Sequence, residues 1–557
     1  MATTSFPTKT ALAVATAIVA LAVARHIDAT KGLSPTIFAE AAHLNLLRHA
    51  PSAHPHATAT GTAPPPTPIG TKADGTPCPI LPGVSASTSH HPISPYLIDD
   101  CGTLDPFFAA LHPLEEPAKP GNPETVTVLH YGDSPTTADL ITGDVRELLQ
   151  SRFGDAGRGF LLAAKPWAWY GHRGVDLSDK GWQTSTAVGK GREEIYGLGG
   201  ASFEGSPGAS THITLKNPDQ TSIEIAFLAR PNGGNLSASA NDTPIETFST
   251  AADAPRPAWH TVALPPATKS IDLKPTSGAT SGATSGATSG ATSGNVRLFG
   301  GTLRTGHRGV LYSSLGLNGA STSVLSNGFN NAAWAAALTH TRPSLVIINY
   351  GTNESGFGAY VDKQYEPTLR TAIARIRAAL PNVPILVMSP MDRGQRSGVN
   401  EIKTYDTIPR ILAIQRRVAA ELDCAFFDTF NAMGGDGTMS RWYTGHPRLV
   451  AGDLIHPTPQ GAALVANLFV KDLALDYERF LGHATPPPSK QPTAPPAPPT
   501  RQASAKPAPL PLTVITKPKP SAAGDPEPVT PQAPQPEIPA QPPPPTPNPP
   551  TQESPPV

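Results

Sequence analysis

The sequence predicts an α/β fold built on a parallel sheet, and three observations lead to this prediction. Apolar strands alternate with amphipathic helical patterns in two parts of the chain, which is typical of a parallel sheet with helices on both faces. Between these parts lie short strands of alternating polarity. The ends of the chain are poor in apolar periodicity and rich in proline, and the 557 residues include 66 prolines. We therefore expect a globular region over about 97–482.

The strands of the parallel sheet are expected at 125–131, 309–315, 345–350, 384–389 and 424–428. Amphipathic helices are expected at 139–152, 323–340, 366–380, 408–422 and 459–481. The carboxyl ends of parallel strands share one edge of a sheet, which is where such folds bind ligands.

Residues 165–305 interrupt this alternation and are expected to form an inserted β-sandwich. Short alternating strands are indicated at 212–216, 222–229, 235–240, 260–264, 270–273 and 296–298. The Thr-Ser-Gly-Ala repeat at 276–294 is too small and polar to pack, so it predicts a flexible surface loop.

The two ends of the chain carry different signals. Lys9 precedes an apolar stretch at 11–24, which has the length of a signal-peptide core, so 1–24 is expected to be a signal peptide or an uncleaved N-terminal anchor. Residues 25–96 are expected to be a linker rich in Pro, Ala, Ser and Thr, and 483–557 a disordered Pro-rich tail. We therefore expect export to the periplasm or cell envelope, with membrane anchoring if the leader is retained.

Charge and cysteine content exclude several classes of function. The net charge is −1 without a basic tract, which argues against nucleic acid as a partner. Cys78 and Cys101 could form a disulfide in an oxidising compartment, which leaves Cys424 as a buried thiol. No CxxC pair or HExxH helix is present, so no metal site is predicted.

Two short motifs supply the parts of a serine nucleophile system. Ser134 ends a Gly-Asp-Ser triplet directly after an apolar strand, and Pro135 suits the first position of a helix that Ser134 would cap. A serine hydroxyl needs a base that a third group orients. His456 and Asp453, in an Asp-x-x-His motif before the last helix, suit these two roles. Each motif alone is more often ordinary turn or surface structure.

Two further blocks lie between these motifs, namely Leu315–Ala320 and Tyr350–Glu354. The four ordered blocks of Ser, Gly, Asn and Asp-x-x-His resemble the SGNH (GDSL-type) hydrolase superfamily over 97–164 and 306–482. This resemblance implies a three-layer α/β/α, flavodoxin-like domain. It also implies catalytic Ser134, His456 and Asp453, with an oxyanion hole formed by Ser134, Gly319 and Asn353. Gly316 is the alternative for the glycine.

A subgroup of this superfamily, the peptidoglycan O-acetylesterases, includes members with an inserted carbohydrate-binding-module-like β-sandwich, and this chain resembles that arrangement. Residues 153–160 also resemble that subgroup. Trp167, Trp169 and Tyr170 could stack on a sugar ring at the start of the insertion. Packing between the two domains is the more frequent role of such large aromatic residues.

The resemblance implies an exported serine esterase that removes O-acyl groups, with O-acetyl expected, from an envelope polysaccharide such as peptidoglycan. The reaction would proceed through an acyl-serine and require no cofactor. Three alternatives stay open at this point: an O-acyltransferase on an envelope glycan, a lipase or thioesterase of the same superfamily, and a non-catalytic glycan-binding protein.

Overall fold

The computed structural model of this protein describes residues 94–120, 124–188, 195–276, 294–398 and 401–482. The predicted signal or anchor segment, almost all of the predicted linker, the Thr-Ser-Gly-Ala repeat and the predicted Pro-rich tail lie outside these residues.

A six-stranded sheet lies at the centre of the α/β domain, with the strand order β1-β19-β16-β15-β2-β14. The strands are β1 (Leu97–Ile98), β2 (Thr125–Gly132), β14 (Gly309–Gly316), β15 (Leu345–Asn349), β16 (Ile385–Met388) and β19 (Ala425–Phe427). β1 pairs antiparallel with β19, and the other five strands are parallel. The predicted α/β class with a parallel sheet is confirmed, because all five predicted strands are present near their expected bounds.

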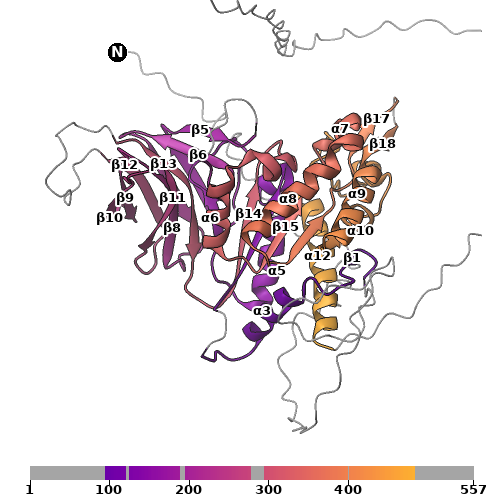
Figure 1. The fold of residues 1–557 in the computed structure, drawn as a ribbon, viewed down its shortest axis with the longest axis horizontal. Coiled ribbons are helices and arrows are strands. Elements are labelled where there is room, and N and C mark those ends of the chain that lie inside the picture. The colour runs from indigo at the N-terminus through magenta and orange to yellow at the C-terminus, as the bar shows by residue number, and fades with distance from the viewer. Residues whose placement is uncertain (1–93, 121–123, 189–194, 277–293, 399–400, 483–557) are drawn as a thin grey trace, which may run out of the picture. The chain divides into compact units, whose positions relative to one another are not determined.

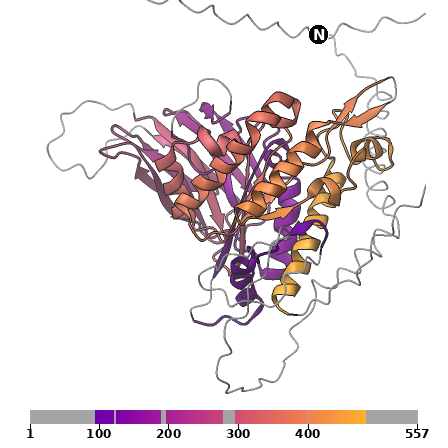
Figure 2. The same cartoon turned by 45° about the vertical axis from the view of Figure 1, so that its right-hand side comes forward.

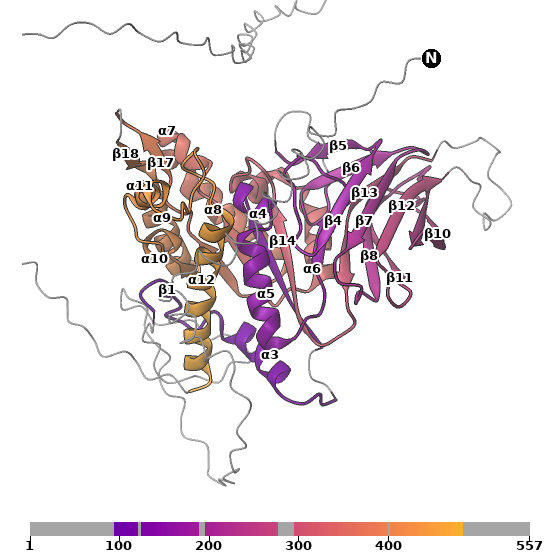
Figure 3. The same cartoon turned by 180° about the vertical axis from the view of Figure 1, so that it is seen from behind.

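Helices cover both faces of this sheet, as Figures 1 and 3 show from opposite sides. One face packs against α3 (Asp105–Glu115), α5 (Ile141–Phe153) and α12 (Pro459–Phe480), and the other against α6 (Asn331–Thr341), α8 (Tyr365–Ala379) and α9 (Thr407–Glu421). Successive residues of a strand face opposite sides, so Val128 belongs to the first hydrophobic core and Leu129 to the second. This alternation explains why the strands are apolar throughout.

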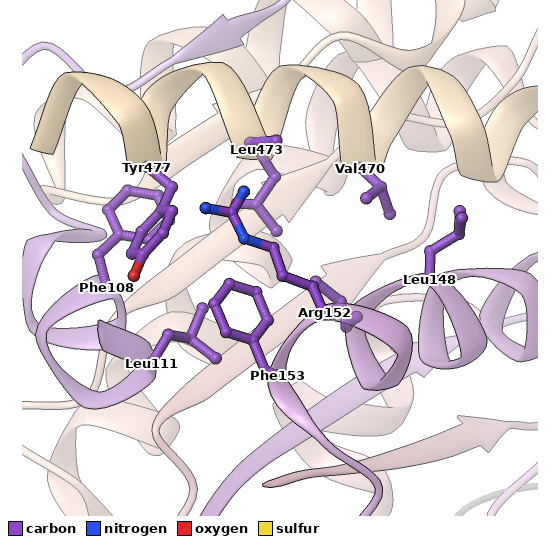
Figure 4. Close-up of a pocket in the computed structure, with 10 residues that line it drawn as sticks. Phe108, Leu111, Leu148, Arg152, Phe153, Val470, Leu473 and Tyr477 are labelled. Atoms are coloured by element: carbon purple, nitrogen blue, oxygen red, sulfur yellow. The ribbon is translucent and has the colours of Figure 1, made fainter. Parts of the chain in front are cut away.

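Arg152 of α5 joins the three helices of the first face (Figure 4). Its guanidinium pairs with Glu115 of α3 at 2.7 Å and with Glu478 of α12 at 2.9 Å, and it lies 4.8 Å from the centre of the Tyr477 ring. An ion pair with stacked aromatic contacts fixes helix positions because a guanidinium is planar and directional. α12 begins three residues after His456, so this packing also fixes the helix behind the Asp-x-x-His motif.

Two antiparallel sheets lie between β2 and β14 in the sequence and share a hydrophobic core (Figure 2). Their strand orders are β10-β9-β12-β7-β4 and β11-β8-β13-β6-β5, and β3 pairs with β13. The strands are β3 (Gly159–Leu162), β4 (Val175–Lys180), β5 (Gln183–Thr186), β6 (Ala201–Gly205), β7 (Ser210–Leu215), β8 (Ser222–Ala229), β9 (Asn235–Ala240), β10 (Thr243–Ser249), β11 (Arg256–Ala263), β12 (Ser270–Thr276) and β13 (Val296–Arg304). This arrangement is a β-sandwich.

The segment before the sandwich covers the outer edge of β14. The Val310 amide donates to the Gly154 carbonyl at 2.9 Å, and the Val310 carbonyl accepts from Ala156. The Phe160 amide donates to the Ser313 hydroxyl at 3.1 Å. β3 therefore lies between the central sheet and the sandwich, because it contacts β14 of the central sheet and hydrogen-bonds with β13 of the sandwich.

Several elements differ from the sequence prediction. The helix expected at 323–340 is divided into a π-helical turn at Val324–Gly328 and α6, whose N-terminus Asn330 caps by accepting from the Ala333 amide. Several elements were not predicted from the sequence. In the α/β domain these are β1, α3, α4 (Ser134–Thr137), a 3-10 turn at Glu354–Gly356, α7 (Gly358–Lys363), α10 (Thr429–Ala432), α11 (Thr438–Thr444) and the hairpin of β17 (Gly394–Arg396) and β18 (Ile402–Thr404). In and before the sandwich they are β3, β4, β5, β6 and β10.

Candidate active site

Ser134 lies where β2 ends and the short helix α4 begins. Asp133 is the N-cap, and its carbonyl accepts from the Thr136 and Thr137 amides. The prediction that Ser134 caps the helix is therefore wrong by one residue, because Ser134 is already the first helical residue. Gly132 permits the sharp turn, since a Cβ at this position would lie 2.2 Å from the Thr136 hydroxyl. The turn leaves Ser134 half-buried.

The structure brings the predicted serine, histidine and aspartate together. His456 Nε2 lies 2.7 Å from Ser134 Oγ, and His456 Nδ1 lies 2.7 Å from Asp453 Oδ2. Burial acts to raise the pKa of Asp453, but the hydrogen bonds from the His456 ring and from the His456 and Ile455 amides lower it below its ordinary value. Asp453 is thus ionised at neutral pH and holds Nδ1 protonated, which leaves Nε2 free to accept the serine proton.

The Asp-x-x-His loop depends on an unusual backbone conformation at Leu454. This residue has a φ of 62°, although a leucine rarely adopts the left-handed region. Its buried side chain and two hydrogen bonds hold it in place: the Leu454 amide donates to Ala451, and the Leu454 carbonyl accepts from Gly394 at 3.0 Å. The reversal at Leu454 allows Asp453 to fold back onto His456.

The two candidate glycines have very different surroundings. Gly316 ends β14 and is buried against α4, where an added Cβ would lie 2.2 Å from the Thr137 amide nitrogen. Gly319 is exposed, has a φ of 72° and would have only Val188 within 4 Å of an added Cβ. Its amide makes no hydrogen bond within the part of the chain that the structure describes. The surroundings favour Gly319 as the oxyanion donor and give Gly316 a packing role.

Asn353 lies next to the Gly319 loop. Its Nδ2 donates to the Ala320 carbonyl at 2.8 Å, which uses one of its two amide hydrogens. Its second amide hydrogen makes no hydrogen bond with any of the described residues. The structure therefore brings together the glycine and asparagine blocks.

Two buried carboxyl groups, which the sequence analysis did not single out, lie behind these residues. Glu354 accepts from the Thr322 amide, the Thr322 hydroxyl and the Gly351 amide, so it ties the loop after Gly319 to the loop that carries Asn353. Burial, together with repulsion from Glu354, raises the pKa of Asp133 to about 7. The only sequence signal for Glu354 is its position directly after Asn353.

The three predicted substrate-binding aromatics occupy different environments. Tyr170 is buried, and its hydroxyl accepts from the Leu162 amide, which is the packing role considered above. Trp167 is partly buried against the shared core. Trp169 is 55% exposed, and its Nε1 donates to Asn318 Oδ1 at 3.3 Å, next to Gly319. Of the three, Trp169 has both the exposure and the location for a substrate contact.

Phe357 is a further exposed aromatic that sequence reasoning missed. It is 68% exposed and lies four residues after Asn353. An exposed large apolar side chain beside a polar site is informative, because most such side chains are buried. A single Phe in a loop gives no periodic signal that could have identified it.

Other predicted features are only partly within the described residues. Cys101 is disulfide-bonded and Cys424 is a buried thiol that forms no disulfide, whereas Cys78 lies outside the described residues. No group of three or more His, Cys, Asp and Glu side chains in the described ranges could hold a metal ion. None of the described helices is long and apolar enough to cross a bilayer. The apolar stretch at 11–24 is not among the residues to which this applies.

Comparisons with known proteins agree with this geometry. A model of the GDSL-like lipase/acylhydrolase family matches residues 278–464, a range that contains Gly319, Asn353, Asp453 and His456. A solved peptidoglycan O-acetylesterase is similar in structure with a TM-score of 0.55 and 22% identity, and the match covers 67% of this chain and 96% of that chain. The chain has the SGNH hydrolase fold. Within that fold it resembles peptidoglycan O-acetylesterases.

Other solved structures match smaller parts of this chain. A putative GDSL-like lipase from Parabacteroides merdae is 18% identical over 29% of this chain and 72% of that chain, with a TM-score of 0.23. A carbohydrate esterase family 3 structure from Talaromyces cellulolyticus is 16% identical over 31% and 73%, with a TM-score of 0.22. No curated protein matches the chain. The family match, together with the Ser-His-Asp contacts, supports acyl-ester hydrolysis as the general reaction.

Proposed function

We propose that this SGNH hydrolase is an exported serine esterase that removes O-acetyl groups from a cell-envelope polysaccharide such as peptidoglycan. The observation that carries the proposal is the chain of two 2.7 Å contacts from Ser134 through His456 to Asp453. The similarity to a peptidoglycan O-acetylesterase, which extends over 96% of that chain, supports the choice of substrate.

The reaction follows from the positions of these groups. Ser134 Oγ attacks the ester carbonyl while its proton passes to His456 Nε2. The amides of Ser134 and Gly319 and the Asn353 side chain stabilise the oxyanion. His456 then gives the proton to the departing sugar oxygen, and an acyl-serine remains. Water attacks this ester, His456 takes the water proton and returns it to Ser134, and the free acid leaves.

Solvent access favours hydrolysis over acyl transfer. The side chains of His456 and Asp453 are 42% and 46% exposed, so water can reach the base at the second step. An acyltransferase would use the same residues but would benefit from a site that excludes water. A non-catalytic glycan-binding protein would need no serine hydroxyl within hydrogen-bonding distance of a histidine.

Export is part of this proposal because the acylated substrate lies outside the cytoplasm. It is supported by the apolar stretch at 11–24 after Lys9 and by the disulfide at Cys101. Radiolabelled or tagged protein recovered from the periplasm or envelope fraction would support it. Recovery from the cytoplasm alone would contradict it.

Turnover of a chromogenic acetyl ester by Ser134→Ala and His456→Ala tests the reaction. Each variant should lose at least about 10⁴-fold in kcat. Ser151→Ala is a matched control, because that exposed hydroxyl on α5 only bonds the Leu148 carbonyl. Retained turnover in either triad variant would exclude the mechanism.

Acetate release from O-acetylated peptidoglycan, acetylated xylan and lipid esters tests the substrate. Peptidoglycan should be the best of the three by kcat/KM. A preference for lipid esters would assign the protein to the lipase or thioesterase alternative instead.

A further inference from the structure

The side chains of two exposed arginines contact the ring of Tyr443, in segments next to the Asp-x-x-His loop. The Arg396 Cζ is 5.1 Å from the centre of the Tyr443 ring, and the Arg448 Cζ is 4.2 Å from it. Arg448 also donates to the Tyr443 carbonyl at 3.0 Å. Cation–π contacts of this kind hold guanidinium groups in place without neutralising them. We call Arg396, Tyr443 and Arg448 the arginine–tyrosine cluster.

Among the residues that the structure describes, no carboxylate balances the charge of this cluster. Neither arginine forms an ion pair with any side chain in the described ranges. Glu401, just before β18 of the same hairpin, is already engaged by Lys403 at 3.0 Å and by the Ser397 hydroxyl at 2.8 Å. The hydrogen bond from Arg396 and the charge of both arginines lower the pKa of Tyr443, which is consistent with a locally positive potential.

Both arginines belong to segments that touch the catalytic loop. On one side, Gly394 of β17 donates to Leu454, and Arg396 follows two residues later, about 7 Å further along the strand. On the other side, the Ala451 amide donates to the His456 carbonyl, and the Arg448 carbonyl accepts from the Thr458 hydroxyl. Both arginines therefore belong to segments that hydrogen-bond with the Asp-x-x-His loop, and neither is part of the triad.

A buried aspartate fixes the position of the β17–β18 hairpin against α11. Asp392, just before β17, is 1% exposed and accepts from the Met439 amide at 2.7 Å and from the Thr404 hydroxyl at 2.8 Å. It joins the β17–β18 hairpin to α11, the helix that contains Tyr443. Figure 1 shows this hairpin beside α7, at the opposite side of the α/β domain from the β-sandwich. These buried hydrogen bonds hold the segments that carry Arg396 and Tyr443 in fixed positions.

We propose that Arg396 and Arg448 form a subsite that binds a carboxylate of the acylated substrate beside the bond that Ser134 cleaves. Planar guanidinium groups recognise carboxylates through paired hydrogen bonds, and their charge favours an anionic polymer. The subsite rests on the proposed esterase function and deepens it, because it makes acidic acylated glycans the preferred class. The carboxylate can come from a sugar acid or from a peptide attached to the sugar.

The double variant R396Q/R448Q tests this subsite with three acetylated oligosaccharides of equal length. One is neutral, one carries a sugar carboxylate and one carries a peptide carboxylate. Wild type should show a lower KM for a carboxylate substrate than for the neutral one. The ratio of the KM for the neutral substrate to the KM for the carboxylate substrate should be roughly tenfold smaller in the variant. Turnover of the neutral substrate should be unchanged. R256Q is the matched control, because Arg256 is an exposed arginine on β11 of the sandwich.

Methyl esterification of the substrate carboxylate supplies a second measurement that does not depend on folding of the variant. It should raise the wild-type KM as much as R396Q/R448Q does, with no further effect in the variant. The carboxylate substrate whose KM rises in R396Q/R448Q identifies the source of the carboxylate, either the sugar acid or the peptide. If wild type cleaves the neutral substrate but treats all three alike, the subsite is wrong and the esterase function stands. If wild type cleaves none of the three or any simple acetyl ester, the esterase function itself fails.

Discussion

The Asn353 side-chain amide donates a 2.8 Å hydrogen bond to the Ala320 carbonyl. This bond places the asparagine directly beside the loop that carries Gly319, although the two blocks are separated by α6 and β15 in the sequence. The bond fixes the direction of the remaining amide hydrogen before any substrate binds. Preorganised donors of this kind account for much of the rate of acyl-transfer enzymes, because they need no reorientation during the reaction.

Replacement of Asn353 by alanine should therefore lower kcat on acetyl esters by about 10²- to 10³-fold with little change in KM. Steady-state kinetics on a chromogenic acetyl ester would measure this. Asn330→Ala is the control. It removes the cap of α6 and should cost about 1 kcal/mol of folding stability without lowering kcat. Equal losses of kcat in both variants would show that Asn353 has only a structural role.

Gly316 and Gly319 should respond differently to replacement by alanine. Gly316→Ala places a Cβ against the backbone of α4 and should displace Ser134, so we expect losses of both stability and activity. Gly319→Ala has open space and costs only about 1 kcal/mol for its positive φ. Thermal melts beside kinetics would separate the effects. If Gly316→Ala were the better tolerated of the two, our distinction between the glycines would be wrong.

The raised pKa of Asp133 predicts a specific pH dependence of stability. Between its ordinary value of 3.8 and about 7, the folded protein holds a proton that the unfolded chain has released. The free energy of unfolding should therefore fall as the pH rises through this window, and the contribution should be constant above it. Asp139, whose pKa Arg146 and His172 lower to about 2 against the effect of burial, titrates below this window.

Asp133→Asn should remove the part of this dependence that Asp133 contributes, so the variant should gain stability relative to wild type between pH 5 and pH 8. Urea unfolding at both pH values would measure it. Asp406→Asn, whose side chain is 85% exposed in the wild type, is the control and should keep the wild-type slope. A slope unchanged in Asp133→Asn would mean that Asp133 is ionised throughout the range.

Trp169→Ala should raise KM for acetylated oligosaccharides by roughly tenfold, and leave kcat for a small acetyl ester within about twofold. The reason is that the exposed indole can contact a sugar ring but not the reacting carbonyl. Tyr170→Phe, which keeps the buried ring and loses only its hydrogen bond to Leu162, is the comparison and should affect stability alone. A Trp169→Ala variant with unchanged KM on oligosaccharides would leave the indole without a substrate contact.

The placement of the reacting side chains could be predicted because local sequence determines it. Ser134 and Asn353 each follow a strongly apolar strand of the parallel sheet, and His456 precedes a capped helix, so the sheet geometry alone brings them to one edge. The start of α5 was predicted two residues too early. Asp139 has a φ of 52° and turns inward to pair with Arg146, and only tertiary contacts determine this conformation.

The elements around the site were harder to predict for a related reason. The β17–β18 hairpin and α11 are short and carry no clear apolar period, and the buried Asp392 holds them in place. A single buried carboxylate leaves no pattern in the sequence. The same is true of Glu354, whose hydrogen bonds lie in two loops that are distant in the chain.

The segment that leads into the sandwich covers β14, which is the last strand of the central sheet. An uncovered edge strand recruits the strands of other molecules. A shortened chain from which this segment and its partner β13 were cut would present eight apolar-rich residues, Gly309–Gly316, to its neighbours, and self-association would follow. The sandwich therefore cannot simply be deleted. A shorter version of this protein would need another segment to cover the β14 edge of the sheet.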